Sequence, residues 1–321
     1  MKPDTAPLFV GCATALVTPM LPAPAGDGYT PPPVDYEAFV RLVRRQIAAG
    51  VDALVVCGTT GESSTLTDEE KLRLFSLAVQ ESRRAEAEGI ARRHIPVIAG
   101  TGSNNTARAV TLSRLAEKAG CDGLLAVTPY YNKANQAGLV AHYAAITAAV
   151  PLPLLAYHVP GRTGCRLTPE TCLTLSRMEQ IVGLKDATGD AAFTARVAAL
   201  CGNALPLYAG CDDCILPVLA LGGRGAVSVA SNLYPDTVTA LCRAYRAGDT
   251  AQARRLQADL LPLCEALFAD VNPIPVKAAL AGLGLCRDVL RLPLTPAGED
   301  VRRRVRDATQ KACLLYTSDA A

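Results

Sequence analysis

The sequence predicts an α/β fold, a (β/α)8 TIM barrel followed by an all-helical extension. Eight short apolar runs of strand length alternate with longer amphipathic segments up to residue 248, and eight such units favour closure into a barrel. After that point only helix-like segments follow. A doubly wound sheet is the alternative architecture, but it favours a G-x-G-x-x-G loop after an early strand. The sequence contains no such loop.

The predicted strands are apolar runs bounded by glycine, proline and polar turn residues. They cover residues 12–17, 53–57, 96–99, 123–127, 153–157, 181–185, 206–209 and 225–228. Amphipathic periodicity and capping residues predict barrel helices at 36–49, 68–88, 106–119, 139–149, from 169, 190–200, 213–221 and from 235. The extension is predicted to hold helices at 249–268, 275–282 and 296–311. The proline- and glycine-rich segment 19–33 is predicted to be an exposed loop.

The length of 321 residues fits one large barrel with an extension. We assign residues 1–248 to a barrel catalytic domain. Residues 249–312 form the C-terminal helical extension, which is suited to packing on a neighbouring subunit or on its own barrel. Residues 313–321 break the Arg/Ala-rich character of the preceding helix and are interpreted as a non-native or disordered tail.

Composition argues against several classes of protein. A net charge of +2 gives no electrostatic reason to expect nucleic acid or an anionic membrane as a partner. No apolar run is long enough to span a membrane and no signal peptide is visible, so a cytoplasmic location is expected. The 12 cysteines are scattered through apolar segments, which indicates buried reduced thiols. Cys211 and Cys214 have the spacing of a zinc or redox half-site, but without a second pair no metal is expected.

Lys185 ends the sixth predicted strand, and lysines are only 7 of the 32 basic residues. Burial at such a position disfavours the charged ammonium and lowers its pKa. A neutral amine is a nucleophile that can condense with a ketone to form a Schiff base. Taken alone, a strand-end lysine that reaches solvent is the commoner case. The other strand ends therefore decide the interpretation.

Polar residues follow several predicted strands, where active residues of barrels are found. The second strand leads into paired threonines, Thr59 and Thr60, whose hydroxyls and neighbouring amides suit a small carboxylate. The fifth supplies Tyr157, which can relay a proton, and Arg162, a planar fork matched to a carboxylate. With Lys185, and with no metal or nucleotide signature, this set indicates a lyase or aldolase that forms an imine with a keto acid.

The same motifs carry a family resemblance. They are GTTGE at 58–62, TPYYN at 128–132, YHVPGRTG at 157–164, GLKDATG at 183–189 and NPIPVK at 272–277. From about residue 9 to residue 311 the chain resembles the dihydrodipicolinate synthase family, in the superfamily of pyruvate-dependent class I aldolases that includes N-acetylneuraminate lyase. The resemblance implies condensation of pyruvate with L-aspartate 4-semialdehyde in the diaminopimelate route to lysine. It also implies a homo-oligomer, a homotetramer built from dimers, that needs no cofactor.

The resemblance implies a role for each matching residue. Lys185 forms the Schiff base with pyruvate, and Tyr157 is general acid and base. Thr59 links Tyr157 by hydrogen bond to Tyr131, which comes from the neighbouring subunit. The implied substrate-binding residues are Thr60 for the pyruvate carboxylate, Arg162 for the aldehyde's carboxylate, and Gly210 and Val227 through backbone groups beside the imine.

Two departures from the family pattern bear on function. His158 stands where the family commonly has asparagine, and we expect its side chain to point away from the pocket. Lysine-inhibited relatives commonly have histidines at the positions of Asp68 and Lys71 and a glutamate at that of Arg108. A cation at the last position disfavours a bound ammonium. We therefore expect weak or absent lysine inhibition, although the candidate allosteric residues Ser63, Asn104 and Tyr130 are present.

Three alternatives differ in their chemistry. N-acetylneuraminate lyases and 4-hydroxy-2-oxoglutarate aldolases share the Schiff base but usually lack an arginine at the position of Arg162, so Arg162 favours the synthase. A non-enzymatic regulatory barrel is expected to lose Lys185, Tyr157 or Arg162, and all three are present.

Overall fold

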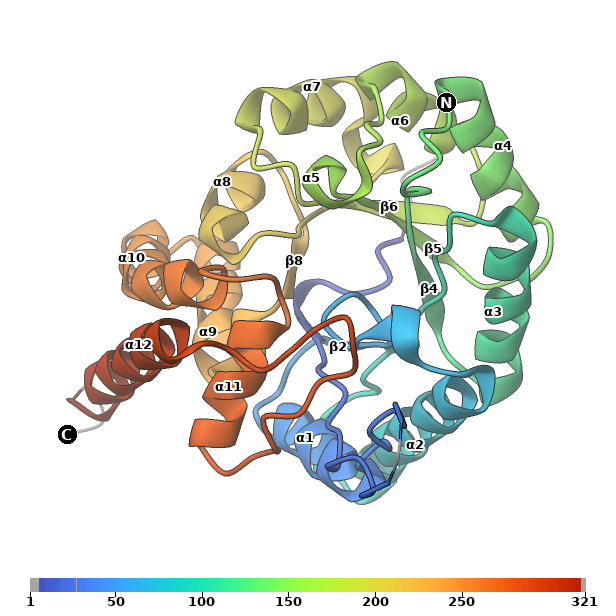
Figure 1. The fold of residues 1–321 in the computed structure, drawn as a ribbon. Coiled ribbons are helices and arrows are strands. Elements are labelled where there is room, and N and C mark those ends of the chain that lie inside the picture. The colour runs from blue at the N-terminus through green and yellow to red at the C-terminus, as the bar shows by residue number, and fades with distance from the viewer. Residues whose placement is uncertain (1–5, 27, 319–321) are drawn as a thin grey trace.

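The computed structural model describes residues 6–26 and 28–318, and only the backbone of 312–318. Eight parallel strands close into a barrel in the order β1 to β8 (Figure 1), which confirms the predicted fold. The strands are β1 Gly11–Ala15, β2 Ala53–Val56, β3 Val97–Gly100, β4 Gly123–Val127, β5 Leu154–His158, β6 Ile181–Asp186, β7 Leu207–Ala209 and β8 Gly225–Ser228. Their bounds differ from the predicted ones by no more than two residues.

Helices surround the barrel (Figure 1). They are α1 Tyr36–Ala48, α2 Asp68–Ala87, α3 Thr106–Ala119, α4 Gln136–Thr147, α6 Pro169–Leu175, α7 Ala191–Cys201, α8 Ile215–Ala220 and α9 Pro235–Arg246. Many of these helices begin at a residue whose side chain caps the first turn, as the sequence predicted. Asp35 accepts a hydrogen bond from the Ala38 amide at 2.9 Å, and Thr67 and Glu70 form a reciprocal capping box on α2. A four-residue helix, α5 Pro160–Thr163, was not predicted.

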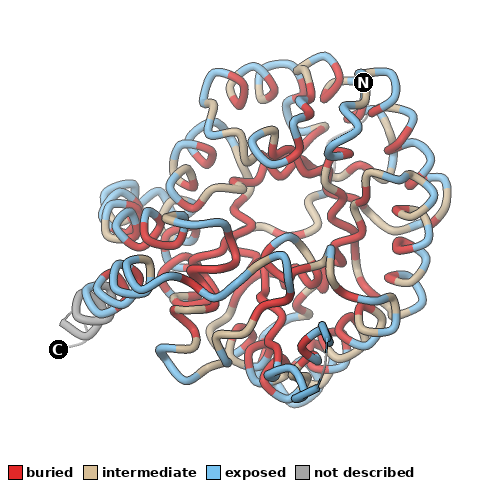
Figure 2. Tube along the Cα trace, viewed as in Figure 1, coloured by how far each residue is buried: buried red, intermediate tan, exposed pale blue. Residues whose placement is uncertain are grey.

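The core has two layers. Residues that point into the barrel form one apolar cluster that includes Leu155, Tyr157, Tyr208 and Val227. A larger cluster fills the space between the strands and the helices. Figure 2 shows this arrangement as buried strands with helices whose outer turns are exposed. Because alternate residues of a strand face opposite sides, Tyr157 points inward and His158 outward.

The predicted loop at residues 19–33 has little regular structure in its described part. An isolated antiparallel bridge joins Met20 to Val34, and the Leu21 amide donates to the Pro33 carbonyl at 2.8 Å. These contacts close the base of the loop. The loop is largely exposed between them, as expected for a proline-rich insertion.

The extension consists of α10 Thr250–Leu267, α11 Ile274–Gly282 and α12 Glu299–Ser318. α10 packs on α9 and also contacts α8, so the extension lies on its own barrel. α11 contacts α12, α10 and the 3-10 turn Ala230–Asn232 that follows β8, and in Figure 1 it lies at the side of the barrel between α9 and α1. α12 continues past the predicted end at residue 311, and residues 319–321 of the predicted tail lie outside the described part. None of the described helices is both long and apolar enough to cross a membrane.

Candidate active site

Lys185 lies at the carboxyl end of β6, between two tyrosines of the neighbouring strands. It is in register with Tyr157 on β5 and with Tyr208 on β7, and only 5% of it is exposed. Its Nζ lies 4.2 Å from the centre of the Tyr157 ring. Burial lowers the pKa of Lys185 to about 8, and the nearby charge of Arg162 acts in the same direction. A substantial fraction of this amine is therefore neutral near pH 7 to 8.

Tyr157 is the second buried titratable group of the site, with 7% of its surface exposed. Burial raises the pKa of its phenol to about 12. The charge of Arg162 and a hydrogen bond with the Thr59 side chain oppose that shift. The phenol is thus protonated at neutral pH and can donate a proton. The structure brings Lys185, Tyr157, Thr59 and Arg162 together from three different strand ends, those of β2, β5 and β6.

The two threonines after β2 differ in their surroundings. Thr59 is exposed, whereas only 3% of Thr60 is accessible. The Thr60 hydroxyl accepts a hydrogen bond from Asn272 Nδ2 at 3.0 Å. Asn272 follows α10 in the extension and is itself buried. A residue more than two hundred positions away therefore contacts the threonine loop.

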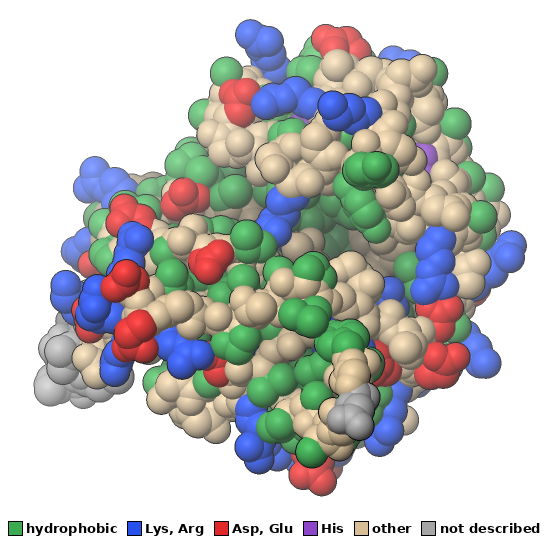
Figure 3. Space-filling view, in the orientation of Figure 1, with side chains coloured by type: hydrophobic (Ala, Val, Ile, Leu, Met, Phe, Trp, Pro, Cys, Tyr) green, Lys and Arg blue, Asp and Glu red, His purple; other side chains and the backbone are tan. Residues whose placement is uncertain are grey.

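Arg162 lies on α5, the short helix that follows β5. Its side chain is exposed on the face of the molecule that carries α5. Figure 3 shows that this face is hollowed near its centre and that a basic side chain borders the hollow. Among the residues that the structure describes, the guanidinium makes one hydrogen bond, from Nη2 to the Asn272 carbonyl at 3.3 Å. Its other donors are available for a carboxylate.

Gly210 directly follows β7 and Val227 lies on β8, the two strands that come after β6 in the barrel. The Gly210 amide donates to the Asp186 carbonyl at 2.7 Å. A Cβ at Gly210 would stand 2.7 Å from Ala187 Cβ, so this close approach requires glycine. Val227 on β8 is fully buried in the apolar cluster that holds Tyr157.

Tyr131 is not brought to the other site residues within this chain. Its side chain is 88% exposed, and no hydrogen bond of its hydroxyl is found among the described residues. Its backbone has a positive φ of 74° and its amide donates to the Thr163 carbonyl at 3.2 Å. A large aromatic side chain held outward on a strained backbone is available to another molecule.

The three candidate allosteric residues lie in the loops after β2, β3 and β4. Ser63 begins a short 3-10 turn, Tyr130 is 37% exposed, and the Asn104 carbonyl accepts from Asn132 Nδ2 at 2.9 Å. Near them Arg108 Nη1 donates to Asp68 Oδ2 at 2.6 Å. This pairing raises the pKa of Arg108 and lowers that of Asp68.

His158 points out of the barrel, as expected. It is fully buried, packs against Phe193 of α7, and its Nε2 accepts from the Leu167 amide at 3.0 Å. Burial lowers its pKa to about 4. The imidazole is therefore neutral at physiological pH and acts as a buried packing group.

Sequence reasoning gave no role to Asp212 or Asn272, both of which lie at the site. Asp212 accepts from the Val229 and Ala230 amides at 2.9 and 3.0 Å, and its charge acts on Lys185 to raise the pKa of that amine. Burial raises the pKa of Asp212 itself. Both residues stand inside motifs that were noted, beside the predicted seventh strand and in NPIPVK. In the sequence neither residue stands out by its polarity, because Asp213 follows Asp212 and Asp270 lies two positions before Asn272.

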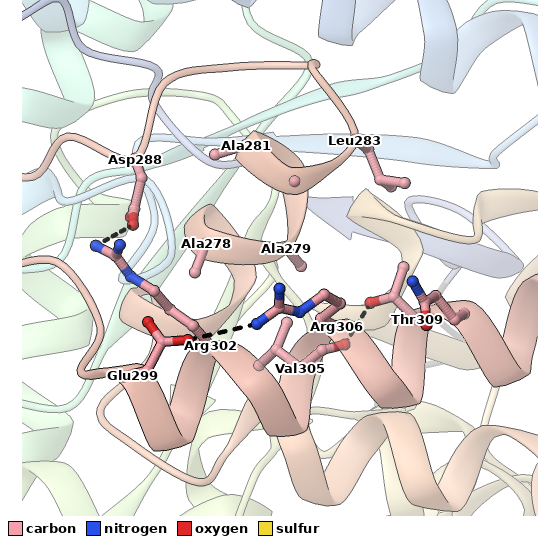
Figure 4. A pocket seen from close by; sticks show the side chains of 12 residues that line it. Ala278, Ala279, Ala281, Leu283, Asp288, Glu299, Arg302, Val305, Arg306 and Thr309 are labelled. Carbon is pink, nitrogen blue, oxygen red and sulfur yellow. Dashed lines mark hydrogen bonds and ion pairs between the residues drawn. The ribbon is translucent and has the colours of Figure 1, made fainter.

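A cavity of about 500 Å³ lies between α11 and α12 (Figure 4). Small residues of α11, including Ala278 and Ala279, form one wall. Ion pairs of Arg302 with Asp288 at 2.9 Å and of Arg306 with Glu299 at 3.4 Å border it. None of the candidate site residues lines this cavity, so it is separate from the barrel mouth.

A closed barrel of eight parallel strands, with a buried lysine and tyrosine at its mouth, defines a Schiff-base lyase of the class I aldolase type. Residues 8–312 match the Dihydrodipicolinate synthetase family. The chain belongs to that family, which confirms the resemblance. No group of three or more potential metal-ligating side chains is found in the described part of the chain.

Relatives and solved structures of the same family cover nearly the whole chain. The 4-hydroxy-tetrahydrodipicolinate synthase of Geobacter sulfurreducens is 44% identical over 292 residues, which are 91% of this chain and 94% of the relative. The dihydrodipicolinate synthase of Cyanidioschyzon merolae, solved with lysine bound, has a TM-score of 0.87 at 39% identity and covers 96% of this chain and 100% of its own. The chloride-inhibited enzyme of Acinetobacter baumannii, complexed with pyruvate, has a TM-score of 0.86 at 39% identity, over 95% and 99%.

Proposed function

We propose that this chain is a 4-hydroxy-tetrahydrodipicolinate synthase, which condenses pyruvate with L-aspartate 4-semialdehyde on the diaminopimelate route to lysine. The observation that carries the proposal is the buried amine of Lys185, 4.2 Å from the Tyr157 ring and with its pKa lowered to about 8. The family membership and the names of its relatives support the reaction. The relative solved with pyruvate supports the first substrate.

The first half-reaction attaches pyruvate to the chain. The neutral amine of Lys185 attacks the ketone carbon, and a bond from Nζ to that carbon forms. Tyr157 donates its proton to the departing hydroxyl, which leaves as water, and an iminium remains. Thr60 holds the pyruvate carboxylate. Gly210 and Val227 bring backbone groups close to the imine.

The second half-reaction makes the carbon–carbon bond. Tyr157, left as a phenolate by the first half-reaction, takes a proton from the methyl carbon of the iminium and gives an enamine, whose carbon attacks the aldehyde. The oxygen of the aldehyde then takes up that proton from Tyr157. Attack of the second substrate's amino group on the iminium carbon breaks the bond to Lys185 Nζ and frees the amine. Arg162 holds the carboxylate of the aldehyde substrate through its free donors. The hydrogen bond of Thr59 with Tyr157 supports a relay by which the phenol is protonated again.

Tyr131 completes the relay in this proposal from a second copy of the chain. Its 88% exposed side chain and its outward backbone conformation suit that role. The proposed assembly is a homotetramer built from dimers, located in the cytoplasm and working without a cofactor. Analytical ultracentrifugation over a dilution series measures the oligomeric state, and single-turnover assays at the same concentrations measure the activity. Together they test the role of Tyr131. A fully active monomer contradicts it.

Trapping the imine tests the proposed function. We expect borohydride reduction in the presence of pyruvate to add a pyruvyl-derived mass to the peptide that contains Lys185. Lys277 is the matched control, because it is buried but ion-paired, and its peptide should stay unmodified. The absence of an adduct on Lys185 contradicts the Schiff-base mechanism.

The second candidate is another pyruvate aldolase of the superfamily, and the aldehyde distinguishes it. Arg162 at the barrel mouth favours an aldehyde that carries a carboxylate. We expect turnover with L-aspartate 4-semialdehyde to exceed retro-aldol cleavage of N-acetylneuraminate and of 4-hydroxy-2-oxoglutarate. A higher kcat/KM for either cleavage reaction contradicts the synthase assignment.

A further inference from the structure

The segment between α10 and α11 contacts both proposed carboxylate-binding side chains through one residue. Asn272 Nδ2 donates to the Thr60 hydroxyl at 3.0 Å, and the Asn272 carbonyl accepts from Arg162 Nη2 at 3.3 Å. Thr60 follows β2 and Arg162 follows β5. The extension thus joins two loops of the barrel mouth that share no hydrogen bond with each other among the described residues.

Asn272 is itself held in place by a buried charge network five residues further on. Lys277, which is fully buried, pairs with Glu62 at 2.6 Å and donates to the Thr18 carbonyl at 2.9 Å. The second oxygen of Glu62 accepts from the Arg291 amide at 3.0 Å. Glu62 has a left-handed φ of 54°, which fixes its loop only two residues after Thr60. The 58–63 loop and the 272–277 segment are therefore joined at two points.

The direction of the first hydrogen bond has a chemical consequence. An amide N–H can only donate, so the Thr60 oxygen is the acceptor. The hydroxyl proton of Thr60 is then free to be donated elsewhere, and a substrate carboxylate is the partner that gains most from it. The contact of Arg162 with the Asn272 carbonyl uses one N–H of the guanidinium, and the other N–H groups remain available to a substrate carboxylate.

We propose that Asn272 is a positioning residue for substrate binding. Its side chain directs the Thr60 hydroxyl toward the pyruvate carboxylate, and its backbone places Arg162 for the carboxylate of the second substrate. The Lys277–Glu62 pair holds the segment that contains Asn272 against the loop that contains Thr60. This inference rests on the proposed function and gives the helical extension a part in the active site.

A double-mutant cycle on pyruvate binding tests the side-chain part of the proposal. We expect Asn272→Ala to raise the KM for pyruvate about tenfold with a smaller change in kcat, because a hydrogen bond to a charged group is weakened. Thr60→Val should raise it at least as much. Because Asn272 acts through Thr60, the double variant should resemble Thr60→Val alone. Additive effects overturn the proposal.

The control is a second buried asparagine whose side chain makes no hydrogen bond with a proposed site residue among the described residues. Asn232 donates to the Ala15 and Val229 carbonyls at 2.8 and 2.9 Å and is 1% exposed. Asn232→Ala should lower the melting temperature but leave both KM values within about twofold. If Asn272→Ala lowers the melting temperature equally and changes neither KM, its role is structural and the inference is wrong.

The anchoring part is tested by removing both charges of the pair. We expect the double variant Lys277→Met with Glu62→Leu to fold, since no buried charge is left without a partner, and to raise the KM for both substrates several-fold. Unchanged KM values overturn the anchoring role. Borohydride trapping of pyruvate on the unmodified enzyme separates the two levels: no adduct there rejects the proposed function, whereas an adduct with unaffected variants rejects only this inference.

Discussion

Lys185 and Lys277 are both buried on the carboxyl-terminal side of the barrel, and they differ in what surrounds the ammonium. Lys277 lies 2.6 Å from a Glu62 carboxylate and 2.9 Å from a carbonyl oxygen. Lys185 faces the Tyr157 ring at 4.2 Å and has no ion pair among the described residues. The same side chain is therefore a buried ion-pair partner at one position and, in the proposed function, the reactive amine at the other.

The difference follows from how burial acts on a charge. A buried ammonium that contacts a carboxylate and a carbonyl regains in those contacts part of the interaction that it loses with water. An unpaired ammonium is destabilised relative to the neutral amine, and its pKa falls. For Lys185 the fall to about 8 spans roughly 2.5 pH units from an ordinary lysine. At about 1.4 kcal/mol per unit this corresponds to stability on the order of 3 kcal/mol lost at neutral pH.

The largest expected effect is the loss of the reactive amine. Lys185→Met should lower the condensation rate at least about a thousandfold, because no other nucleophile replaces it. It should also raise the melting temperature, since an unpaired buried ammonium is removed. Steady-state kinetics and thermal unfolding measure the two changes. An active variant, or one that unfolds more easily than the original chain, contradicts the contrast between the two lysines.

The same substitution at Lys277 should lower the stability of the fold. Lys277→Met leaves Glu62 buried without its partner and should lower the free energy of unfolding by about 3–5 kcal/mol. Adding Glu62→Leu should recover most of this loss, because the second charge is then removed as well. Urea unfolding at pH 7 measures the stability of both variants and of the original chain. If Lys277→Met is as stable as the original chain, the pair is not the stabilising feature described above.

Sequence reasoning predicted the part of this contrast that depends on local pattern. Strand length, the position of Lys185 at a strand end and the alternation of faces along β5 predicted a ring of polar side chains at one barrel face. Helix α3 and strands β4 and β8 have the predicted bounds. The four-residue helix α5 was missed because one turn is too short to show helical periodicity.

The partners of the two lysines could not be predicted from local pattern. Glu62 and Lys277 are 215 positions apart, and Thr60 and Asn272 are 212 apart. Nothing in either local pattern encodes such a pair, because only the closed barrel and the packed extension bring them together. The family resemblance identified both motifs, but it did not indicate that Lys277 is paired and Lys185 is not.

The pH dependence of imine trapping should report the lowered pKa of Lys185. Only the neutral amine attacks pyruvate, so the rate of imine trapping should fall about tenfold per pH unit below pH 8. The double variant Lys277→Met with Glu62→Leu should show the same midpoint. A midpoint near that of an ordinary lysine, at about 10.4, contradicts the proposed effect of burial.

The free energy of unfolding should also reflect the lowered pKa of Lys185, at pH values above 8. Between pH 8 and about 10.4 the unfolded chain binds a proton at Lys185 that the folded chain has released. The contribution of this group to stability therefore rises as pH rises through that window and is constant below it. Subtracting the urea stability of Lys185→Met from that of the original chain at each pH isolates the contribution. A difference that does not change between pH 8 and 10 contradicts it.

The smallest expected effect concerns a third lysine, Lys71 on α2, which is 5% exposed. Burial lowers the pKa of Lys71, and the nearby charge of Arg108 acts in the same direction. Lys71 and Arg108 occupy two of the positions at which the chain departs from its lysine-inhibited relatives, so binding of an added ammonium there is opposed by repulsion. We expect L-lysine at about 100 μM to change the rate by less than about a tenth.

Reversing one of these charges sharpens the test. Arg108→Glu places a second carboxylate beside Asp68 and removes its ion pair, so it should create measurable inhibition by lysine. Arg114→Glu, on the exposed side of the same helix, makes the same charge change away from Asp68 and should not. Equal sensitivity of the two variants indicates a general effect of net charge. Strong inhibition of the original chain at micromolar L-lysine shows instead that Lys71 and Arg108 do not exclude an ammonium. The burial of Lys71 then has no bearing on regulation.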